Sequence, residues 1–203
     1  MKLRIAIGAL AVIATAGHCL AADPRYPDWP CAQAKVPEIS IAAVWAGPPL
    51  DDASNKWKND PKISALVERL AARKFPIEDA QKAITEFLAA PGTDKAAAGK
   101  LLFAGLFEKL NAERSAVMSG LERVTRKQRD AADKIRSDTI ALQSLQDATP
   151  PDRTKVDELG NQLLWETRIF EDRRSVIKFV CDVPTTIDKR LFALGRTIQQ
   201  EME

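Results

Sequence analysis

Few side chains in this chain could carry out chemistry, and two of the reactive ones lie close to the N-terminus. The sequence has one histidine, His18, and three cysteines, of which Cys19 directly follows that histidine. The other two, Cys31 and Cys181, stand far apart, with no Cys-x-x-Cys pair and no neighbouring histidine. Such surroundings do not indicate a reactive thiol or a redox pair.

The first 22 residues have the pattern of a secretory signal peptide. Lys2 and Arg4 are followed by an apolar stretch over residues 5–16 and then by small residues. A bilayer span needs roughly 20 apolar residues, so this stretch is too short for one. We expect cleavage after Ala21 or Ala22, a periplasmic or secreted location, and no transmembrane segment in the mature chain.

Two alternatives to cleavage remain open. The segment could stay in place as an uncleaved anchor, or Cys19 could carry a lipid. The bulky His18 argues against the second alternative, because lipid-processing sites have a small residue before the cysteine.

Cleavage would leave a residue set that is poor for catalysis. Without His18, Ser-His-Asp and Cys-His mechanisms are excluded, and so is the commonest general base. The 30 Lys and Arg residues would fall to 28, which equals the 28 Asp and Glu residues and gives no global attraction to nucleic acid. We expect Cys31 and Cys181 to form a disulfide, the alternative being two separate thiols. The sequence therefore predicts no enzyme, no metal and no other cofactor.

Acidic residues are the remaining candidates for acid–base or metal chemistry. The candidates are Asp130, Asp133, Asp138, Glu166, Glu171 and Asp172. Pairs of them could form a glycosidase site or a metal site between helices. However, Lys134, Arg136 and Arg168 stand three or four residues from Asp130, Asp133 and Asp172, respectively. The favoured interpretation is a solvated helix face with weak ion pairs.

A basic group could contact an acidic protein, lipid headgroups or an anionic polysaccharide. Its members are Arg123, Arg126, Lys127, Arg129, Arg173 and Arg174. The group lacks interleaved aromatic residues, and an exported protein meets little nucleic acid. A solubilising surface is the favoured interpretation.

Residues 23–61 are rich in proline and tryptophan, which predicts an extended strap. Seven prolines forbid a long helix there, and only a short helix over residues 40–45 is expected. Trp29, Trp45 and Trp57 could line an aromatic ligand pocket. The favoured interpretation is that they anchor the strap to a helical core.

The rest of the chain, residues 62–203, predicts one all-α domain. Two short helices are expected over residues 61–75 and 77–90, followed by a long helix over 93–148, capped by Thr93. A turn at residues 149–152 leads into a returning helix capped by Thr149. Pro184 should end or kink that helix, and a capping box at 185–188 should begin a last helix that packs near residues 95–110.

The long helix and the returning helix have apolar seams that predict an antiparallel, coiled-coil-like hairpin. In the expected register, the residue numbers of two facing positions add up to 301. Leu121 therefore faces Val180, and Val124 faces Ile177. The register also sets Gly120 opposite Cys181. We interpret this glycine as making room for the strap that brings Cys31 to Cys181.

These features predict a non-enzymatic adaptor, chaperone or accessory subunit that acts outside the cytoplasm. The partner would be another protein or a second copy of the chain, bound through the hairpin tip at about residues 135–164. The alternative function is a small-ligand carrier or enzyme with a pocket between the tryptophan-bearing strap and the helices.

Overall fold

The computed structural model describes residues 23–50, 53–54 and 56–203. The predicted signal peptide lies outside these described residues. Every regular element in the described part of the chain is a helix, so the all-α prediction is confirmed. The elements are α1 (Ile41–Val44), the 3-10 helix η1 (Trp57–Asn59), α2 (Pro61–Ala71), α3 (Ile77–Leu88), α4 (Lys95–Asp147), α5 (Arg153–Val180) and α6 (Asp182–Met202).

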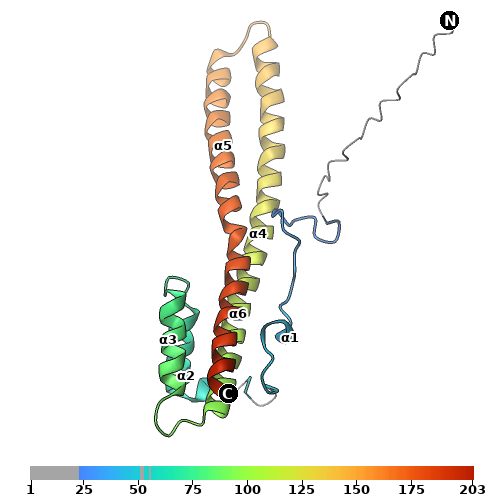
Figure 1. Ribbon diagram of the computed structural model, residues 1–203. Coiled ribbons are helices and arrows are strands. Elements are labelled where there is room, and N and C mark those ends of the chain that lie inside the picture. Colours follow the sequence, from blue (N-terminus) through green and yellow to red (C-terminus); the bar gives the residue numbers. More distant parts are fainter. Residues whose placement is uncertain (1–22, 51–52, 55) are drawn as a thin grey trace, which may run out of the picture.

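The molecule has a thick end and a long two-helix extension (Figure 1). The 53 residues of α4 span about 80 Å at 1.5 Å per residue. Helices α5 and α6 return beside α4, almost end to end, so α4 contacts both of them. The short helices pack at the thick end, α2 against α4 and α3 chiefly against α6. The predicted antiparallel hairpin is confirmed.

The hydrophobic core lies where α2, α3, α6 and the first part of α4 meet. Its fully buried side chains include Val67, Leu70, Ile84, Leu88, Leu102, Phe103, Leu106, Leu110, Ile187, Leu191, Leu194 and Ile198. Gly195 of α6 lies against Phe103 of α4, where a Cβ atom would be only 2.8 Å from the ring. The last helix therefore packs near residues 95–110, as its apolar spacing predicts.

Two predicted helix caps are wrong, one by one residue and the other by three. Asp94 rather than Thr93 caps α4, because its side chain accepts the Ala97 N–H. Asp152 rather than Thr149 caps α5 in the same way. In both cases an aspartate stands closer to the first helical turn than the threonine does.

The predicted capping box at residues 185–188 is also wrong. Helix α6 begins at Asp182, directly after α5 ends. Pro184 fits within the first turn, where a missing N–H leaves no intrahelical bond unmade. Asp188 is free for a tertiary contact, and it accepts from Nε of the buried Arg114 at 2.7 Å.

The strap runs antiparallel to α4 and is fixed at several points. The predicted disulfide between Cys31 and Cys181 is present, with its Cα atoms 5.5 Å apart. Lys35 pairs with Glu122 at 2.5 Å, and the carbonyl of Pro37 accepts from Arg114 at 3.3 Å. The short helix α1 matches the helix expected over residues 40–45.

Gly120 does not make room for the strap, so this interpretation is corrected. A Cβ atom at position 120 would meet only the Arg123 guanidinium, at an ordinary 3.8 Å. The strap contacts α4 on another side, at Glu122 and Arg126. Gly120 instead opens onto a cleft between α4 and α5.

Gly105 is the glycine whose substitution should disturb the core. A Cβ atom there would lie 2.7 Å from Val67 Cγ2 and 2.9 Å from Trp57 Cδ2, and both side chains are buried. We expect Gly105→Ala to lower the free energy of unfolding by about 1–3 kcal/mol through overpacking. Urea unfolding monitored by circular dichroism measures it.

Gly160 provides the matched control, because a Cβ atom there meets nothing within 4 Å. Gly160→Ala should raise the free energy of unfolding by up to about 1 kcal/mol through helix propensity. Equal stability of the two variants would contradict the packing at Gly105.

Candidate functional site

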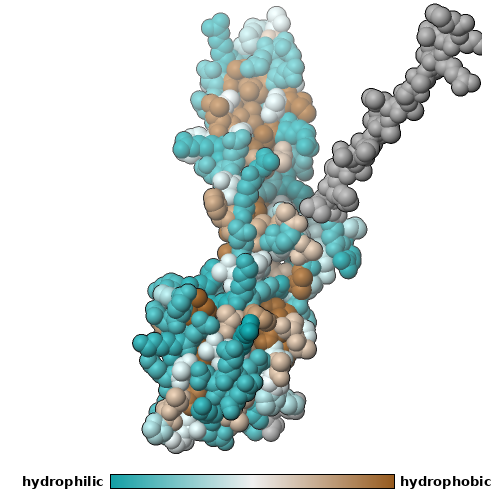
Figure 2. All heavy atoms as spheres, viewed as in Figure 1, coloured by the Kyte–Doolittle hydropathy of each residue, from teal (hydrophilic) through white to brown (hydrophobic). Residues whose placement is uncertain are grey.

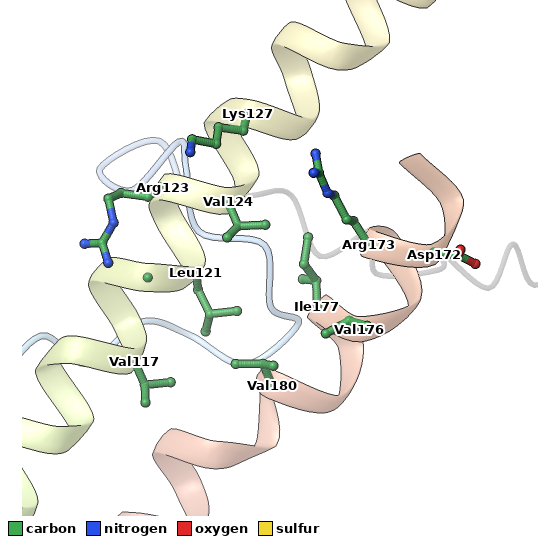
Figure 3. A pocket seen from close by; sticks show the side chains of 11 residues that line it. Val117, Leu121, Arg123, Val124, Lys127, Asp172, Arg173, Val176, Ile177 and Val180 are labelled. Carbon is green, nitrogen blue, oxygen red and sulfur yellow. The ribbon is translucent and has the colours of Figure 1, made fainter. Parts of the chain in front are cut away.

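An open, apolar cleft of about 580 Å³ lies between α4 and α5. It lies at the base of the hairpin, where the extension leaves the core. Figure 3 shows Val117, Leu121 and Val124 of α4 facing Ile177 and Val180 of α5. The lining residues are Val117, Gly120, Leu121, Arg123, Val124, Lys127, Asp172, Arg173, Val176, Ile177 and Val180.

The cleft exists because short side chains line both helices. Val124 and Ile177, which the sequence pairs in the seam, stand on opposite walls, and so do Leu121 and Val180. Four of the eleven lining residues are valines and one is glycine, so the walls do not fill the space between them. Val124 remains 38% exposed. The register predicts which residues face each other but not that a gap separates them.

The rim of the cleft is positively charged. Arg123 and Lys127 of α4 and Arg173 of α5 stand at its edge, and all three are exposed. None of them forms an ion pair within the described part of the chain. Arg173 extends toward the cleft, whereas the carboxylate of Asp172 points away from α4 (Figure 3). An anionic group at the mouth of the cleft would therefore meet unpaired cations.

The other predicted basic residues have different surroundings. Arg126 pairs with Asp28 of the strap at 2.7 Å, and Arg129 contacts the same carboxylate. Arg174 is exposed on α5 and does not line the cleft. The structure thus divides the predicted group: the strap occupies two members, and three others surround the cleft.

Three of the six predicted acidic candidates, Asp133, Asp138 and Glu166, lie in ion pairs along the hairpin. Lys134 pairs with Asp138 at 2.5 Å and with Glu166 at 2.7 Å, rather than with Asp130. These contacts raise the pKa of Lys134, and hydrogen bonds from Lys134 and Gln162 lower the pKa of Glu166. The expected pair of Asp133 with Arg136 is present at 2.9 Å.

Glu171 and Asp172 form no ion pair within the described residues, and Arg168 does not reach Asp172. The described residues contain no group of three or more His, Cys, Asp or Glu side chains placed to hold a metal ion. None of the helices in the described ranges is long and apolar enough to cross a membrane.

The three predicted tryptophans do not share one place. Trp45 is buried and stacks on Phe103, with ring centroids 4.2 Å apart. Trp57 is buried as well and donates from Nε1 to Glu108 at 2.9 Å. Trp29 is half-buried and donates to the carbonyl of Gln33 within the strap. Two of the three therefore belong to the core contacts of the strap.

A second apolar surface lies on α5 beside the cleft. Its exposed residues are Trp165, Ile169, Val176 and Phe179. We call them the α5 stripe. Figure 2 shows hydrophobic surface bordered by hydrophilic residues along the hairpin. Each residue of the stripe directly precedes a residue of the inner seam, and the sequence pattern assigned only the inner seam. The signal for the stripe was Trp165, which belonged to no predicted site. Ile169, Val176 and Phe179 follow it at successive steps of four, seven and three residues.

The contact between Trp57 and Glu108 predicts a pH effect on stability. Hydrogen bonds from Lys58 and then from Trp57 hold the pKa of Glu108 below its usual value. A lowered pKa stabilises the fold above the unfolded pKa of about 4.3, and that contribution disappears as the pH falls through the folded pKa. Glu108→Gln should therefore cost about 1 kcal/mol at pH 7 and progressively less below about pH 4.

Urea unfolding at a series of pH values measures this difference. Glu68→Gln is the control, because Glu68 pairs with Lys109 at the surface, at 2.7 Å, without a tryptophan partner. Its effect at pH 7 should be smaller. A Glu108→Gln difference that did not shrink at low pH would contradict the assignment.

The chain was compared with family models, with curated proteins and with solved structures. No family model matches it, and neither a curated protein nor a solved structure does so. Its function therefore has to follow from the cleft, its charged rim and the α5 stripe.

Proposed function

We propose that the protein is an exported, non-enzymatic binding protein that holds a helix of a partner protein against its hairpin. It would act as an adaptor, chaperone or accessory subunit in the periplasm or outside the cell. The basic and apolar pattern of residues 1–22 supports export. The Cys31–Cys181 disulfide also supports it, since structural disulfides are rare in reducing compartments.

The observation that carries the proposal is the exposed apolar surface of the hairpin, made up of the cleft and the α5 stripe. The cleft and the α5 stripe adjoin, because Val176 belongs to both. Phe179 is 75% exposed and Trp165 is 66% exposed on the same helix. Exposed apolar surface of this kind marks interaction sites, and a groove between two helices suits the apolar face of a third.

The charges indicate what kind of helix would fit. Arg123, Lys127 and Arg173 surround the apolar floor without internal partners. A docked helix would place apolar residues on the valines and acidic residues beside these cations. Acidic flanks would add specificity and a faster association rate.

A site between the strap and the helices has less support. Trp45 lines a hollow of about 250 Å³ between the strap and α6, but neither Trp29 nor Trp57 does, so the three tryptophans share no common pocket. Glu166 and Asp138, which could have served as paired catalytic carboxylates, both contact Lys134. These contacts favour a binding surface over a catalytic centre.

Site-specific photo-crosslinking in the exporting cell tests the proposal. A photoreactive residue at Val124 or at Val176 should yield adducts with a protein, because both positions line the cleft. The same residue at the exposed Lys178 is the control. Lys178 lies two residues after Val176, so its side chain is turned about 200° around the axis of α5, away from the cleft. Absence of adducts at Val124 and Val176, or equal adducts at Lys178, would refute the proposal.

A further inference from the structure

The α5 stripe has the spacing of a second coiled-coil seam. Trp165, Ile169, Asp172, Val176 and Phe179 follow one another at alternating steps of four and three residues. The inner seam of α5 already faces α4, so this second seam has no partner in the described part of the chain. Exposures of 66% for Trp165, 40% for Ile169, 58% for Val176 and 75% for Phe179 show how much apolar surface stays open.

The order of residue types along this stripe is the same in both directions. It runs from an aromatic through an aliphatic residue to Asp172, and then through an aliphatic residue to an aromatic. An antiparallel copy of α5 would therefore place Ile169 opposite Val176 of the second copy. Trp165 would stand within one residue of the level of Phe179 of the second copy. Such self-complementarity is what an interface with two-fold symmetry requires.

The charges near the centre are self-complementary too. The two-fold axis would pass between positions 172 and 173, which brings Asp172 beside Arg173 of the second copy, with Arg168 of that copy one turn away. None of these three side chains forms an ion pair within the described residues. A parallel arrangement would instead bring two copies of the thick end side by side.

We propose that the partner on this face is a second copy of the chain, docked antiparallel through the α5 stripe and covering the cleft. This proposal rests on the proposed function and names its partner. A stable interface buries about 800 Å² on each side, to which each aromatic side chain can contribute on the order of 150 Å². Trp165 and Phe179 would thus be the main anchors, in keeping with the aromatic residues that dominate interface energies.

Sedimentation equilibrium of the full, oxidised chain tests the stoichiometry. We expect a dimer, and we expect Val176→Asp with Phe179→Asp to raise its dissociation constant by at least about tenfold, because both residues would be buried in the interface. Lys178→Asp introduces the same side chain on another side of α5 and should leave the dimer intact. Circular dichroism verifies that each variant is folded, which the exposure of these positions favours.

Cysteine cross-linking tests the orientation independently of any loss of folding. Cysteines at position 172 of two copies would lie near the axis, so Asp172→Cys should oxidise to a covalent dimer. Cysteines at position 169 of two copies would be about seven residues, or roughly 10 Å, apart along the axis. Ile169→Cys alone should therefore fail to cross-link, but a mixture of Ile169→Cys and Val176→Cys should succeed. Efficient cross-linking of Ile169→Cys alone would indicate a parallel pair and overturn the proposal.

The outcomes separate this inference from the proposed function. A strict monomer whose Val176 position still gives adducts with a different protein overturns the second copy as partner but keeps the docking function. A strict monomer without any adduct overturns both. A dimer that the Val176→Asp and Phe179→Asp changes do not weaken overturns the α5 stripe as the interface.

Discussion

The link between Cys31 and Cys181 joins the strap to the point where α5 ends and α6 begins. This point separates the thick end, which has a deep core, from the two-helix extension, which has none. The bridge joins residues 150 positions apart, so it strongly restricts the unfolded chain. Bridges of this kind contribute about 3–5 kcal/mol to the free energy of unfolding. With the strap held there, Trp45 and Trp57 reach the core, and Asp28 reaches α4.

The number of helices that pack around each segment determines which of its apolar residues are buried. At the thick end, α4 has neighbours on several sides, so residues such as Leu106 and Leu110 are fully buried. In the extension each helix has a single long neighbour, so one face is covered and the others remain exposed. Leu163 on the inner seam is buried, whereas the adjacent Leu164 is 72% exposed. A second apolar face on such a helix gains burial only from another molecule.

Sequence periodicity was sufficient for the helices and the hairpin, because each depends on residue type at a fixed spacing. The disulfide followed instead from the two cysteines that remain in a chain expected to be exported. Periodicity did not identify the helix caps. Thr93 and Asp94 are both suitable capping residues, and only the structure shows that the Asp94 side chain accepts the hydrogen bond. The cleft was missed because the register pairs Val124 with Ile177 without giving the distance between the helices. The interpretation of Gly120 failed because the side of α4 on which the strap lies does not follow from α4 and α5 alone.

The strap also determines where positive charge remains. Asp28 contacts Arg126 and Arg129, so these two cations are partly neutralised on the side of α4 that the strap covers. Arg123 and Lys127, on the same helix but at the cleft, keep no such partner. A sequence that is close to neutral in total thus has a locally basic rim around an apolar floor. Because exposed charges are screened within about 8 Å at physiological salt, this local arrangement governs what the cleft attracts, and the total charge does not.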